Sequence, residues 1–511
     1  MKRLYIIIIL SIIAKTITLA QNINASDMLR FSQNYSWGTA RAMGLNGAFG
    51  ALGADQSSMS INPAGIGLFR TSDLAFTLSM NNNTAEATWG NKSSDFSNRL
   101  NIGNIGYVYT SNSNKEEGWI SLSLGLAYNR LNDFNQNITM KNPTGKSSLL
   151  DEFVYYANNS GQGPMPVADL QTGSSKYYEG LAFEYYALDN ELFTGGWYNS
   201  DFTADYNRYG QYQHRKRVIK GGIGEYALSV AGNYSNKFYI GATLGIQKLS
   251  YEDVYDHTED TGNITNFPNL NSFIFSEHRN AYGTGYNFKI GGIYKPIDFL
   301  RLGLAFHTPT FYNINSEFYT SIDTYLKPNG TDPTYFGGST DVRIQNNTLQ
   351  TPWKTIGSVA FVFPKYGLLS IDYERLNYQN LRLSGDDIEY QNDDVKDFTT
   401  VNNLKIGAEI KLIGDLSIRG GLGLYGTPYK NSDLKTLKST SYSAGIGYRA
   451  QRFYFDLAYV IVKYPENYLL YEWNEVDTPV TNIPTYNNNN PSIAKIDYQL
   501  NRFVATIGFR F

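Results

Sequence analysis

The sequence predicts an all-β fold: a transmembrane antiparallel β-barrel of about 14 strands, with an N-terminal plug inside its lumen. Three observations predict it: an alternating apolar pattern in the last strand, no apolar run of membrane-spanning length after the N-terminus, and short turns that alternate with long polar segments. A closed barrel satisfies every backbone hydrogen bond in lipid, and its strands alternate between the lipid and the lumen.

The last strand, residues 502–511, has one apolar face made by Phe503, Ala505, Ile507, Phe509 and Phe511. The same period of two recurs over 300–307 and 404–412. A charge that faces lipid is costly, so the charged face of these strands should look into the lumen. The lumen-facing candidates are therefore Arg301, His307, Lys405 and Glu409.

The N-terminus reads as a signal peptide over residues 1–20. Lys2 and Arg3 precede an apolar run over 4–13, and small residues close the segment before Gln21. The run is too short to span a bilayer of ~30 Å. The sequence has no Cys, which excludes a lipoprotein anchor and disulfides.

The strand pattern gives fourteen candidates with short turns and long loops in alternation. They lie near 73–81, 100–110, 118–131, 224–234, 237–250, 284–294, 299–312, 343–363, 367–378, 401–413, 415–426, 440–449, 452–464 and 502–511. The long polar segments fall near 132–223, 251–283, 313–342, 379–400, 427–439 and 465–501. An even number of strands places both ends of the barrel on the short-turn side, which is periplasmic in outer-membrane barrels.

Residues 21–72 form the predicted plug, or hatch, and residues 73–511 form the barrel. The segment is rich in Gly and small residues, which permit close backbone approach. A barrel of this width needs filling if it is not to leak. The hatch candidates are Gly44, Gly47, Phe49, Asn62, Pro63, Ala64 and Gly65.

At these residues the chain resembles the FadL/TodX-type outer-membrane transporters of hydrophobic compounds. One match runs through Ala40-Arg41-Ala42-Met43-Gly44, Gly47-Ala48-Phe49 and Asn62-Pro63-Ala64-Gly65; a second runs from Tyr294-Lys295-Pro296 to His307-Thr308-Pro309. The resemblance implies passive outer-membrane transport of hydrophobic molecules such as long-chain fatty acids, by a monomer without a cofactor. It also implies a lateral exit at an inward kink of the third strand.

The third predicted strand loses its alternation after Arg130. Asn132, Asp133, Asn135 and Asn137 are polar in near succession and cannot face lipid. Two interpretations stay open: these residues line a lateral gap, or the strand ends there and a loop begins.

Other features fit several interpretations. The run 214–217 is either a site for lipopolysaccharide phosphates or a solvated loop, and the acidic clusters over 252–260 and 386–394 are either Ca²⁺ ligands or plain exposed acids. Aromatic residues between 155 and 197 could form a landing surface for substrate, but packing of a folded loop against itself is favoured.

Some functions find little support. A net charge of −3 gives no basis for nucleic-acid binding, and no set of catalytic residues suggests an enzyme. No metal site is expected. The alternatives to fatty-acid transport are a scaffold or shuttle role in protein secretion, and uptake of haem or aromatic compounds. Haem would need His278 or His307 as its axial ligand.

Overall fold

The computed structural model describes residues 23–33, 37–113, 115–159, 163–189, 197–202, 209–262, 269–327, 332–385, 388, 391–412, 414–430, 439–471 and 492–511. The predicted signal peptide lies outside these residues. Within the described part of the chain, no helix is long and apolar enough to cross a bilayer.

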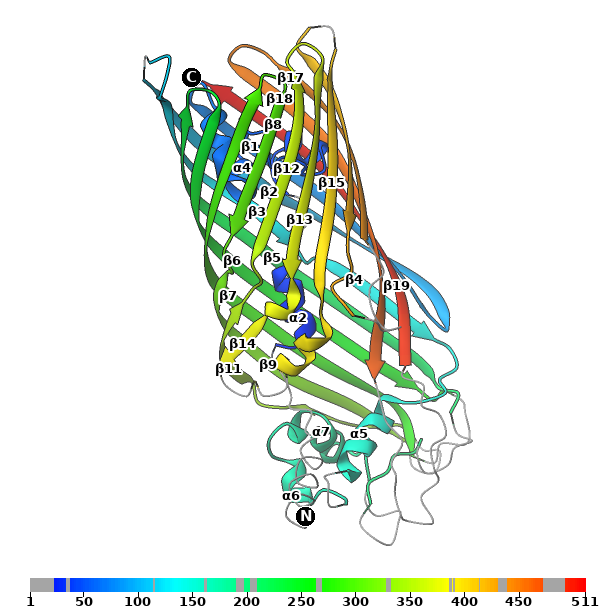
Figure 1. Ribbon diagram of the computed structural model, residues 1–511. Coiled ribbons are helices and arrows are strands. Elements are labelled where there is room, and N and C mark those ends of the chain that lie inside the picture. Colours follow the sequence, from blue (N-terminus) through cyan, green and yellow to red (C-terminus); the bar gives the residue numbers. More distant parts are fainter. Residues whose placement is uncertain are drawn as a thin grey trace, which may run out of the picture.

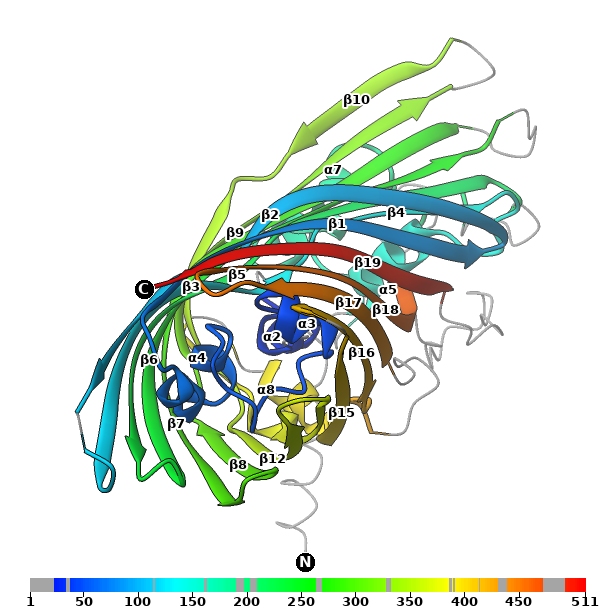
Figure 2. The same cartoon turned by 90° about the horizontal axis from the view of Figure 1, so that it is seen from above.

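The described residues form one antiparallel sheet that closes on itself (Figures 1 and 2). Its segments are β1 (Asp73–Trp89), β2 (Asn91–Asn112), β3 (Trp119–Asp133), β4 (Gln136–Asn142), β5 (Tyr212–Tyr234), β6 (Phe238–Asp260), β7 (Leu270–Ile297), β8 (Leu300–His307), β9 (Phe311–Leu326), β10 (Thr334–Ser339), β11 (Arg343–Gln350), β12 (Lys354–Phe363), β13 (Gly367–Asn377), β14 (Arg382–Gly385), β15 (Thr400–Lys411), β16 (Leu416–Tyr425), β17 (Ser439–Arg449), β18 (Phe453–Tyr471) and β19 (Ser492–Arg510).

The predicted barrel of fourteen strands is confirmed. β1 pairs with β2 on one side and with β19 on the other, which closes the ring. The 19 segments make fourteen barrel strands, because four of these strands are interrupted. The interrupted strands are β3–β4, β8–β9, β10–β11–β12 and β13–β14. The last strand seals the ring, from Asp73 opposite Arg510 to Thr88 opposite Lys495.

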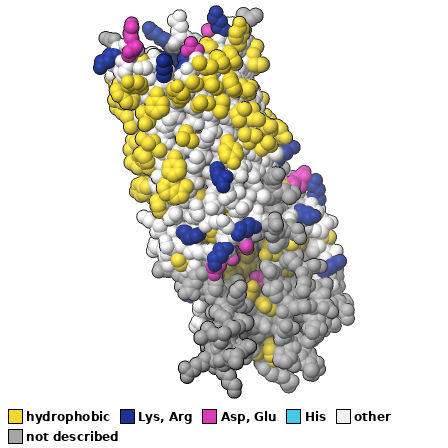
Figure 3. Space-filling model, in the orientation of Figure 1, with side chains coloured by type: hydrophobic (Ala, Val, Ile, Leu, Met, Phe, Trp, Pro, Cys, Tyr) yellow, Lys and Arg dark blue, Asp and Glu magenta, His cyan; other side chains and the backbone are white. Residues whose placement is uncertain are grey.

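An apolar belt covers the half of the barrel that carries the short turns. Figure 3 shows it on one face, and exposed large apolar side chains continue it on the other strands of the ring. In the last strand Phe503, Ile507 and Phe509 point outward, while Val504 and Thr506 are buried, as the alternation predicts. Leu304 in β8 is 63% exposed, although it is flanked by buried side chains on the same strand. Large apolar side chains at such exposure fit a lipid solvent, so this half spans the membrane.

The strands continue well past the predicted ends, on the side away from the short turns. β6 and β7 stay paired without interruption from Phe238 opposite Tyr294 to Asp260 opposite Ser272. The prediction of a loop over 251–283 is therefore wrong for most of that range, as it is for the start of the loop over 465–501, where β18 extends to Tyr471. Beyond the belt both faces lie outside lipid, so the apolar alternation disappears while the backbone pairing persists.

The two ends of the barrel differ as predicted. Short turns join β5 to β6, β12 to β13 and β17 to β18 at one end, beside the C-terminus (Figure 1). At the other end, the long connection between β4 and β5 folds into a helical cap with α5 (Leu149–Asn158), α6 (Val167–Leu170), a 3-10 turn (Ser175–Tyr177) and α7 (Glu179–Glu184). The connection between β14 and β15 holds α8 (Gln391–Asp394), and further 3-10 turns cover Tyr378–Asn380 and Val395–Asp397.

The hatch, residues 23–72, lies inside the ring of strands (Figure 2). It contains α2 (Ala25–Ser32), α3 (Ala40–Gly44), α4 (Ser58–Ile61) and a 3-10 helix (Pro63–Leu68). Local caps explain where these elements begin: Asn24 and Asp27 form a reciprocal capping box, and Asn62 caps the turn that Pro63 opens. The elements α3, α4 and Pro63–Leu68 pack against the wall near the short turns, and α2 lies nearer the cap (Figure 1).

Candidate transport site: hatch, vestibule and wall gap

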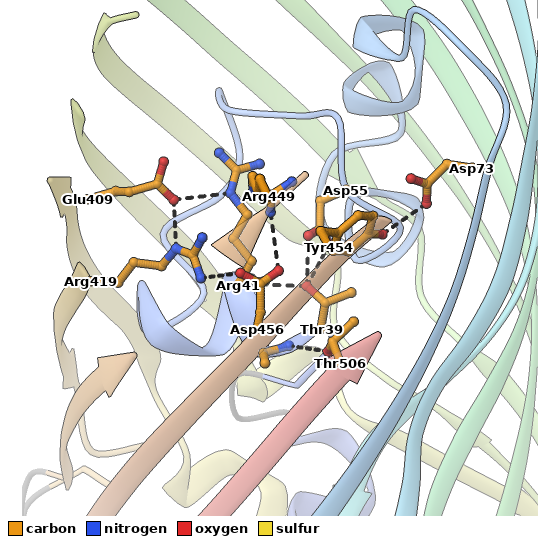
Figure 4. Close-up of polar contacts among 12 residues, drawn as sticks. Thr39, Arg41, Asp55, Asp73, Glu409, Arg419, Arg449, Tyr454, Asp456 and Thr506 are labelled. Atoms are coloured by element: carbon orange, nitrogen blue, oxygen red, sulfur yellow. Dashed lines mark hydrogen bonds and ion pairs between the residues drawn. The ribbon is translucent and has the colours of Figure 1, made fainter. Parts of the chain in front are cut away.

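Polar contacts fasten the first part of the hatch to the wall (Figure 4). The Thr39 hydroxyl donates to both carboxylate oxygens of Asp55, at 2.9 and 2.8 Å. The Ala40 amide donates to Thr506 Oγ1 of β19 at 2.7 Å, and the Arg41 guanidinium lies 3.3 Å from the Glu409 carboxylate of β15. The hatch therefore contacts the closing strand β19 and also β15, four strands away around the ring.

Behind Arg41 runs a chain of buried charges on β15, β16, β17 and β18. Arg419 donates to Glu409 and to Asp456, both at 2.6 Å, and Arg449 donates to Asp456 at 3.2 Å (Figure 4). The side chains of Arg419 and Asp456 have no exposed area. Removing one member of a buried pair leaves an uncompensated charge and costs roughly 3–5 kcal/mol. Arg41 joins the hatch to this wall network through Glu409.

The Asn62-Pro63-Ala64-Gly65 turn is buried against the wall. Asn62 Nδ2 donates to the Gly50 carbonyl at 2.6 Å and to the Gly292 carbonyl of β7 at 3.2 Å. A Cβ added at Gly291 would lie 1.9 Å from Asn62 Oδ1, so only glycine fits at this place on the wall. The turn thus rests directly on the wall backbone.

The other predicted hatch residues are buried as well. The amides of Phe49 and Gly50 both donate to Asp372 Oδ2 of β13 at 2.8 Å. Gly44 sits where an added Cβ would meet the Cα of Gly445 in β17 at 3.5 Å, and Gly47 has a φ of +70°. Sequence reasoning missed the wall partners Asp372, Arg419 and Asp456. The one sequence feature that could have identified them is a charged residue on the lumen face of a strand with alternating apolar residues.

The four predicted lumen-facing residues all point inward. Arg301 Nη1 donates to the Leu52 carbonyl at 2.5 Å, and His307 Nε2 lies 2.9 Å from the Ile61 carbonyl. Lys405 lies 3.6 Å from the Glu374 carboxylate, and Glu409 accepts from the arginines described above. These side chains hold the hatch or balance buried charge; they do not line an apolar pocket.

The third barrel strand is kinked where its alternation fails. β3 ends at Asp133 and β4 starts at Gln136, so the strand continues as a bent strand and does not end in a loop. Both pieces stay paired with β5, with a register shift between Arg130 and Asn132. On the other side, β2 pairs with β3 only from Asn104 opposite Asn129 onward, and with β4 only at Asn91 opposite Lys141. Residues 92–103 and 130–140 thus face each other without backbone pairing.

Polar side chains close this unpaired stretch, which we call the wall gap. Asp133 accepts hydrogen bonds from Asn81 of β1 and, at 2.9 Å, from Asn101 of β2. Arg99 Nε donates to Asn135 Oδ1 at 3.0 Å. Asn137 Nδ2 donates to the Phe96 carbonyl at 3.0 Å. All four predicted gap residues lie at the gap, and Asn132 Nδ2 in addition donates to the carbonyl of Gln33, which caps α2, at 2.7 Å.

The outer lip of the gap is apolar, and a cavity lies behind it. Phe96 and Leu100 of β2 are 65% and 70% exposed. Inside, an inner pocket of about 130 Å³ lies between α2, the kink and β13, β15 and β18, with Phe134 and Gln136 in its lining. Side-chain hydrogen bonds across the gap lie between this pocket and the outer lip, and the strands there are not joined by backbone hydrogen bonds.

A larger cavity of about 560 Å³, the vestibule, opens beneath the cap. Its lining mixes four arginines with carboxylates and aromatic rings: Arg30, Arg215, Arg217, Arg279, Asp27, Glu152, Glu179, Glu277, Asp394, Glu466, Phe153, Tyr156, Tyr178, Tyr255, Tyr429 and Tyr468. Ser26, Arg30, Tyr429 and Glu466 also line the inner pocket. The two cavities therefore adjoin along one side of α2.

A hydrogen-bonded network ties α2 to the vestibule wall. Asp253 accepts from Arg217 at 2.9 and 2.6 Å and from Arg279 at 2.6 Å. Asp27 of α2 accepts from Arg279 at 2.9 Å and from the Tyr251 hydroxyl at 3.0 Å. α2 thus contacts the vestibule through its first turn and the kink through its C-terminal cap.

Two sequence interpretations are corrected here. The run 214–217 belongs to β5 and is therefore not a loop. Arg215 and Arg217 point inward, are buried and form no outer phosphate site, while Lys216 is exposed and His214 is half-buried. Among the acids of 252–260, Asp253 and Glu259 are buried and hydrogen-bonded rather than exposed. Residues 386, 387 and 389 of the second acidic cluster lie outside the described residues. Within the described residues, no group of acidic, His or Cys side chains has the geometry to hold a metal ion.

The aromatic residues of the cap mostly pack inward, on the barrel strands β7 and β9 as well as on one another, and Tyr156 and Tyr178 line the vestibule. Tyr177 contacts Phe318, Tyr178 stacks on Phe275, and Phe183 packs on Tyr198. Tyr186 is the exception at 60% exposure, and Phe193 lies outside the described residues. Burial within the cap raises the pKa of Asp151 and that of Glu179 to about 7 each.

The two histidines considered as haem ligands do not face the vestibule. His278 stacks on Tyr319 of the neighbouring strand, and His307 is buried against the hatch, so neither points a ring nitrogen into the vestibule.

Comparisons with known proteins place the fold. Neither a family model nor a curated protein sequence matches the chain. Solved structures do match. The P. putida toluene transporter TodX is 10% identical with a TM-score of 0.51, over 94% of this chain and 99% of that chain. A Pseudomonas aeruginosa FadL homologue is 13% identical with a TM-score of 0.51, over 94% of this chain and all of that chain. The chain has the FadL/TodX-type barrel fold. At such identities the likeness establishes the fold and leaves the ligand to the chain's own residues.

Proposed function

We propose that the chain is a passive outer-membrane transporter that takes hydrophobic molecules from outside and releases them sideways into the membrane. The observation that carries the proposal is the wall gap between β2 and β3–β4, with a pocket on its inner side and apolar side chains on its outer lip. It is the place where the kinked strand leaves its neighbour, and the exposed Leu100 sets its short-turn end at the edge of the apolar belt.

The hatch supports a lateral route. A straight path to the short-turn end would have to displace α3, α4 and the Asn62 turn. The Arg41–Glu409 ion pair, the amide hydrogen bonds to Asp372 and the contact of Asn62 with the Gly292 carbonyl hold these elements to the wall. Opening the gap requires only the exchange of side-chain hydrogen bonds around Asp133 and Asn135. Because Asp133 and Arg99 are charged, each such bond contributes about 1.5–3 kcal/mol net, less than the roughly 3–5 kcal/mol that breaking a buried ion pair costs.

The vestibule favours an amphiphile over a pure hydrocarbon. Aromatic rings can pack on an apolar tail, while guanidinium and carboxylate groups would stay unsatisfied against an alkane. A long-chain fatty acid or an aromatic compound with a polar substituent fits this description. Nothing in the vestibule offers haem an axial histidine among the described residues.

Closing the gap with a disulfide tests the proposal. Asn101→Cys and Asp133→Cys join side chains that are hydrogen-bonded across the gap, in a chain without native Cys. Thr110→Cys with Ser123→Cys is the matched control, because it joins β2 and β3 where they are already paired. Uptake of a labelled long-chain fatty acid should fall on oxidation of the gap pair, return on reduction, and stay constant in the control.

Two other results would contradict the proposal. Unchanged uptake with the gap disulfide formed would show that ligand leaves elsewhere. No uptake of fatty acid or of an aromatic compound by the wild type would overturn transport and favour the secretion-partner alternative.

A further inference from the structure

A groove of about 630 Å³ lies on the outer surface of the barrel, away from the vestibule and the gap. Its rim comes from outward-facing positions of β6, β7, β9, β11 and β14, and the buried Leu249, Ile314 and Asn347 also line it. The rim carries amides, hydroxyls, one tyrosine ring and one lysine, and the lining holds no carboxylate. A concave, carboxylate-free surface on a barrel wall calls for an explanation of its own, because the hatch and the transport route do not use it.

The groove is built from two rows of directly opposed residues. Lys248, Thr284, Asn313, Thr348 and Ser384 follow one another across five neighbouring strands, each opposite the next. Tyr282, Asn315 and Asn346 form the second row in the same way. Hydrogen bonds order both rows: Lys248 Nζ donates to Thr284 Oγ1 at 2.8 Å, and Asn315 Nδ2 donates to Asn346 Oδ1 at 3.0 Å.

A glycine lies beneath the groove. Gly283 stands between the two rows, and a Cβ there would point toward the lumen side, where it would meet the Asn313 carbonyl and Ile314 Cγ1, both at 3.1 Å. Gly283 has no side chain, and the buried Leu249 and Ile314 beside it line the bottom of the groove.

The height of the groove identifies its environment. Tyr286 and Phe311, directly opposite each other, are 51% and 49% exposed and form the next row toward the short turns. They belong to the edge of the apolar belt, where aromatic side chains mark the membrane interface. The groove therefore sits at the headgroup level of the leaflet on the long-loop side, which is the outer leaflet in barrels of this kind.

We propose that this groove binds the phosphorylated saccharide headgroup of an outer-leaflet glycolipid. Asn and Thr side chains offer both donors and acceptors, which match sugar hydroxyls, and Tyr282 offers an apolar face to a sugar ring. Lys248 supplies the cation for a phosphate. The acyl chains then lie along the belt below Tyr286 and Phe311, which is why the occupant is a lipid and not a free glycan.

This site replaces the run 214–217, whose two arginines are buried, as the candidate contact to lipopolysaccharide, and it is independent of the transport proposal. Its test measures lipid binding to the purified full-length barrel by native mass spectrometry. The probes are bis-phosphorylated lipid A, dephosphorylated lipid A, and phosphatidylglycerol. The groove variants are Asn313→Ala with Asn346→Ala, and Lys248→Gln.

The control is Asn82→Ala with Asn98→Ala. These two amides are also outward-facing and hydrogen-bonded at 2.6 Å, just above the belt on β1 and β2, and they do not line the groove. Heat-modifiable migration of each variant checks that its barrel is folded.

The double groove variant should weaken binding of lipid A about tenfold, from the loss of several hydrogen bonds, and leave phosphatidylglycerol unchanged. Lys248→Gln should weaken only the phosphorylated form, and the control should behave as the wild type. Equal lipid A affinity in the folded groove variant and the wild type would overturn the site. An equal loss for phosphatidylglycerol would show a general lipid effect, and would overturn the glycolipid assignment.

Discussion

The two halves of the barrel differ in their outer surface and in what fills their lumen, although the same strands run through both. The half with the short turns is apolar outside and filled with a tightly held hatch inside; the half with the long loops is polar outside and carries the charged vestibule inside. β6 crosses both: Leu244 is exposed in the belt, while Asp253 is buried in a network of arginines. The comparison shows that contact with lipid or water on the outer face determines whether the apolar alternation is present. The buried charges are determined instead by what the inner face contacts, the hatch or the vestibule.

Deleting the hatch should give the largest effect, because it empties the lumen of the membrane-spanning half. We expect a chain without residues 22–66 to show ion conductance in planar bilayers where the full-length chain shows little. The closing strands do not depend on the hatch for their backbone pairing. A folded deletion variant that conducts no better than the full chain would show that the segment is not the plug.

Breaking the vestibule network should give the next largest effect. Asp253→Asn leaves Arg217 and Arg279 without their shared carboxylate and should lower the free energy of unfolding by roughly 3–5 kcal/mol. Its sequence neighbour Glu252 faces outward and pairs with exposed Lys220, so Glu252→Gln should cost about 0–1 kcal/mol. Denaturant unfolding of both variants in lipid vesicles measures the difference, and equal losses would contradict the assignment of faces.

A charge placed on the outer wall should distinguish the two halves directly. Leu304→Arg puts a guanidinium in the belt and should destabilise the barrel by about 2–4 kcal/mol, whereas Ser250→Arg, exposed beyond the belt, should cost about 0–1 kcal/mol. The same unfolding measurement applies. A similar cost at both positions would place the membrane boundary elsewhere.

The smallest predicted effect is a pH dependence of the cap. Burial raises the pKa of Asp151 to about 7, above the roughly 3.9 of an unfolded chain, so the folded cap binds the proton more tightly. This contribution is full below the unfolded value and is lost as the pH rises toward 7. Proteolysis of the segment over 143–202 should therefore be slower at pH 5.5 than at pH 8.

Asp151→Asn should reduce that pH difference, although Glu179 retains a part of it because its pKa is raised in the same direction. Asp169→Asn, at an exposed position of α6, serves as the control and should leave the difference intact. A pH difference that is equally large in all three proteins would contradict the role of Asp151.

The sequence was sufficient for the membrane-spanning half. Lipid on one face imposes a strict period of two, so strands such as 502–511 can be recognised one at a time. The sequence was insufficient for the half with the long loops. Neither face of the strands contacts lipid there, and β6 and β7 run far past their predicted ends. The same loss of pattern hid the fact that Arg217 and Asp253 point into the lumen.

The candidate site shows a similar division. The polar run 132–137 located the kink because it interrupts an apolar strand, a local signal. Its partners Asn81, Arg99 and Asn101 could not be found, because they depend on the register between strands. The vestibule joins Asp27, Arg217 and Arg279, which lie far apart in the sequence, and only the closed fold brings them together.

Site-specific photo-crosslinking tests the lateral route most directly. A photoreactive amino acid at Gln136, which lines the inner pocket beside the gap, is compared with one at Leu68, in the hatch near the short-turn end. During uptake, a labelled long-chain fatty acid should crosslink at Gln136 and not at Leu68. Crosslinking at Leu68 without crosslinking at Gln136 would show that ligand passes through the hatch, and would contradict release through the wall.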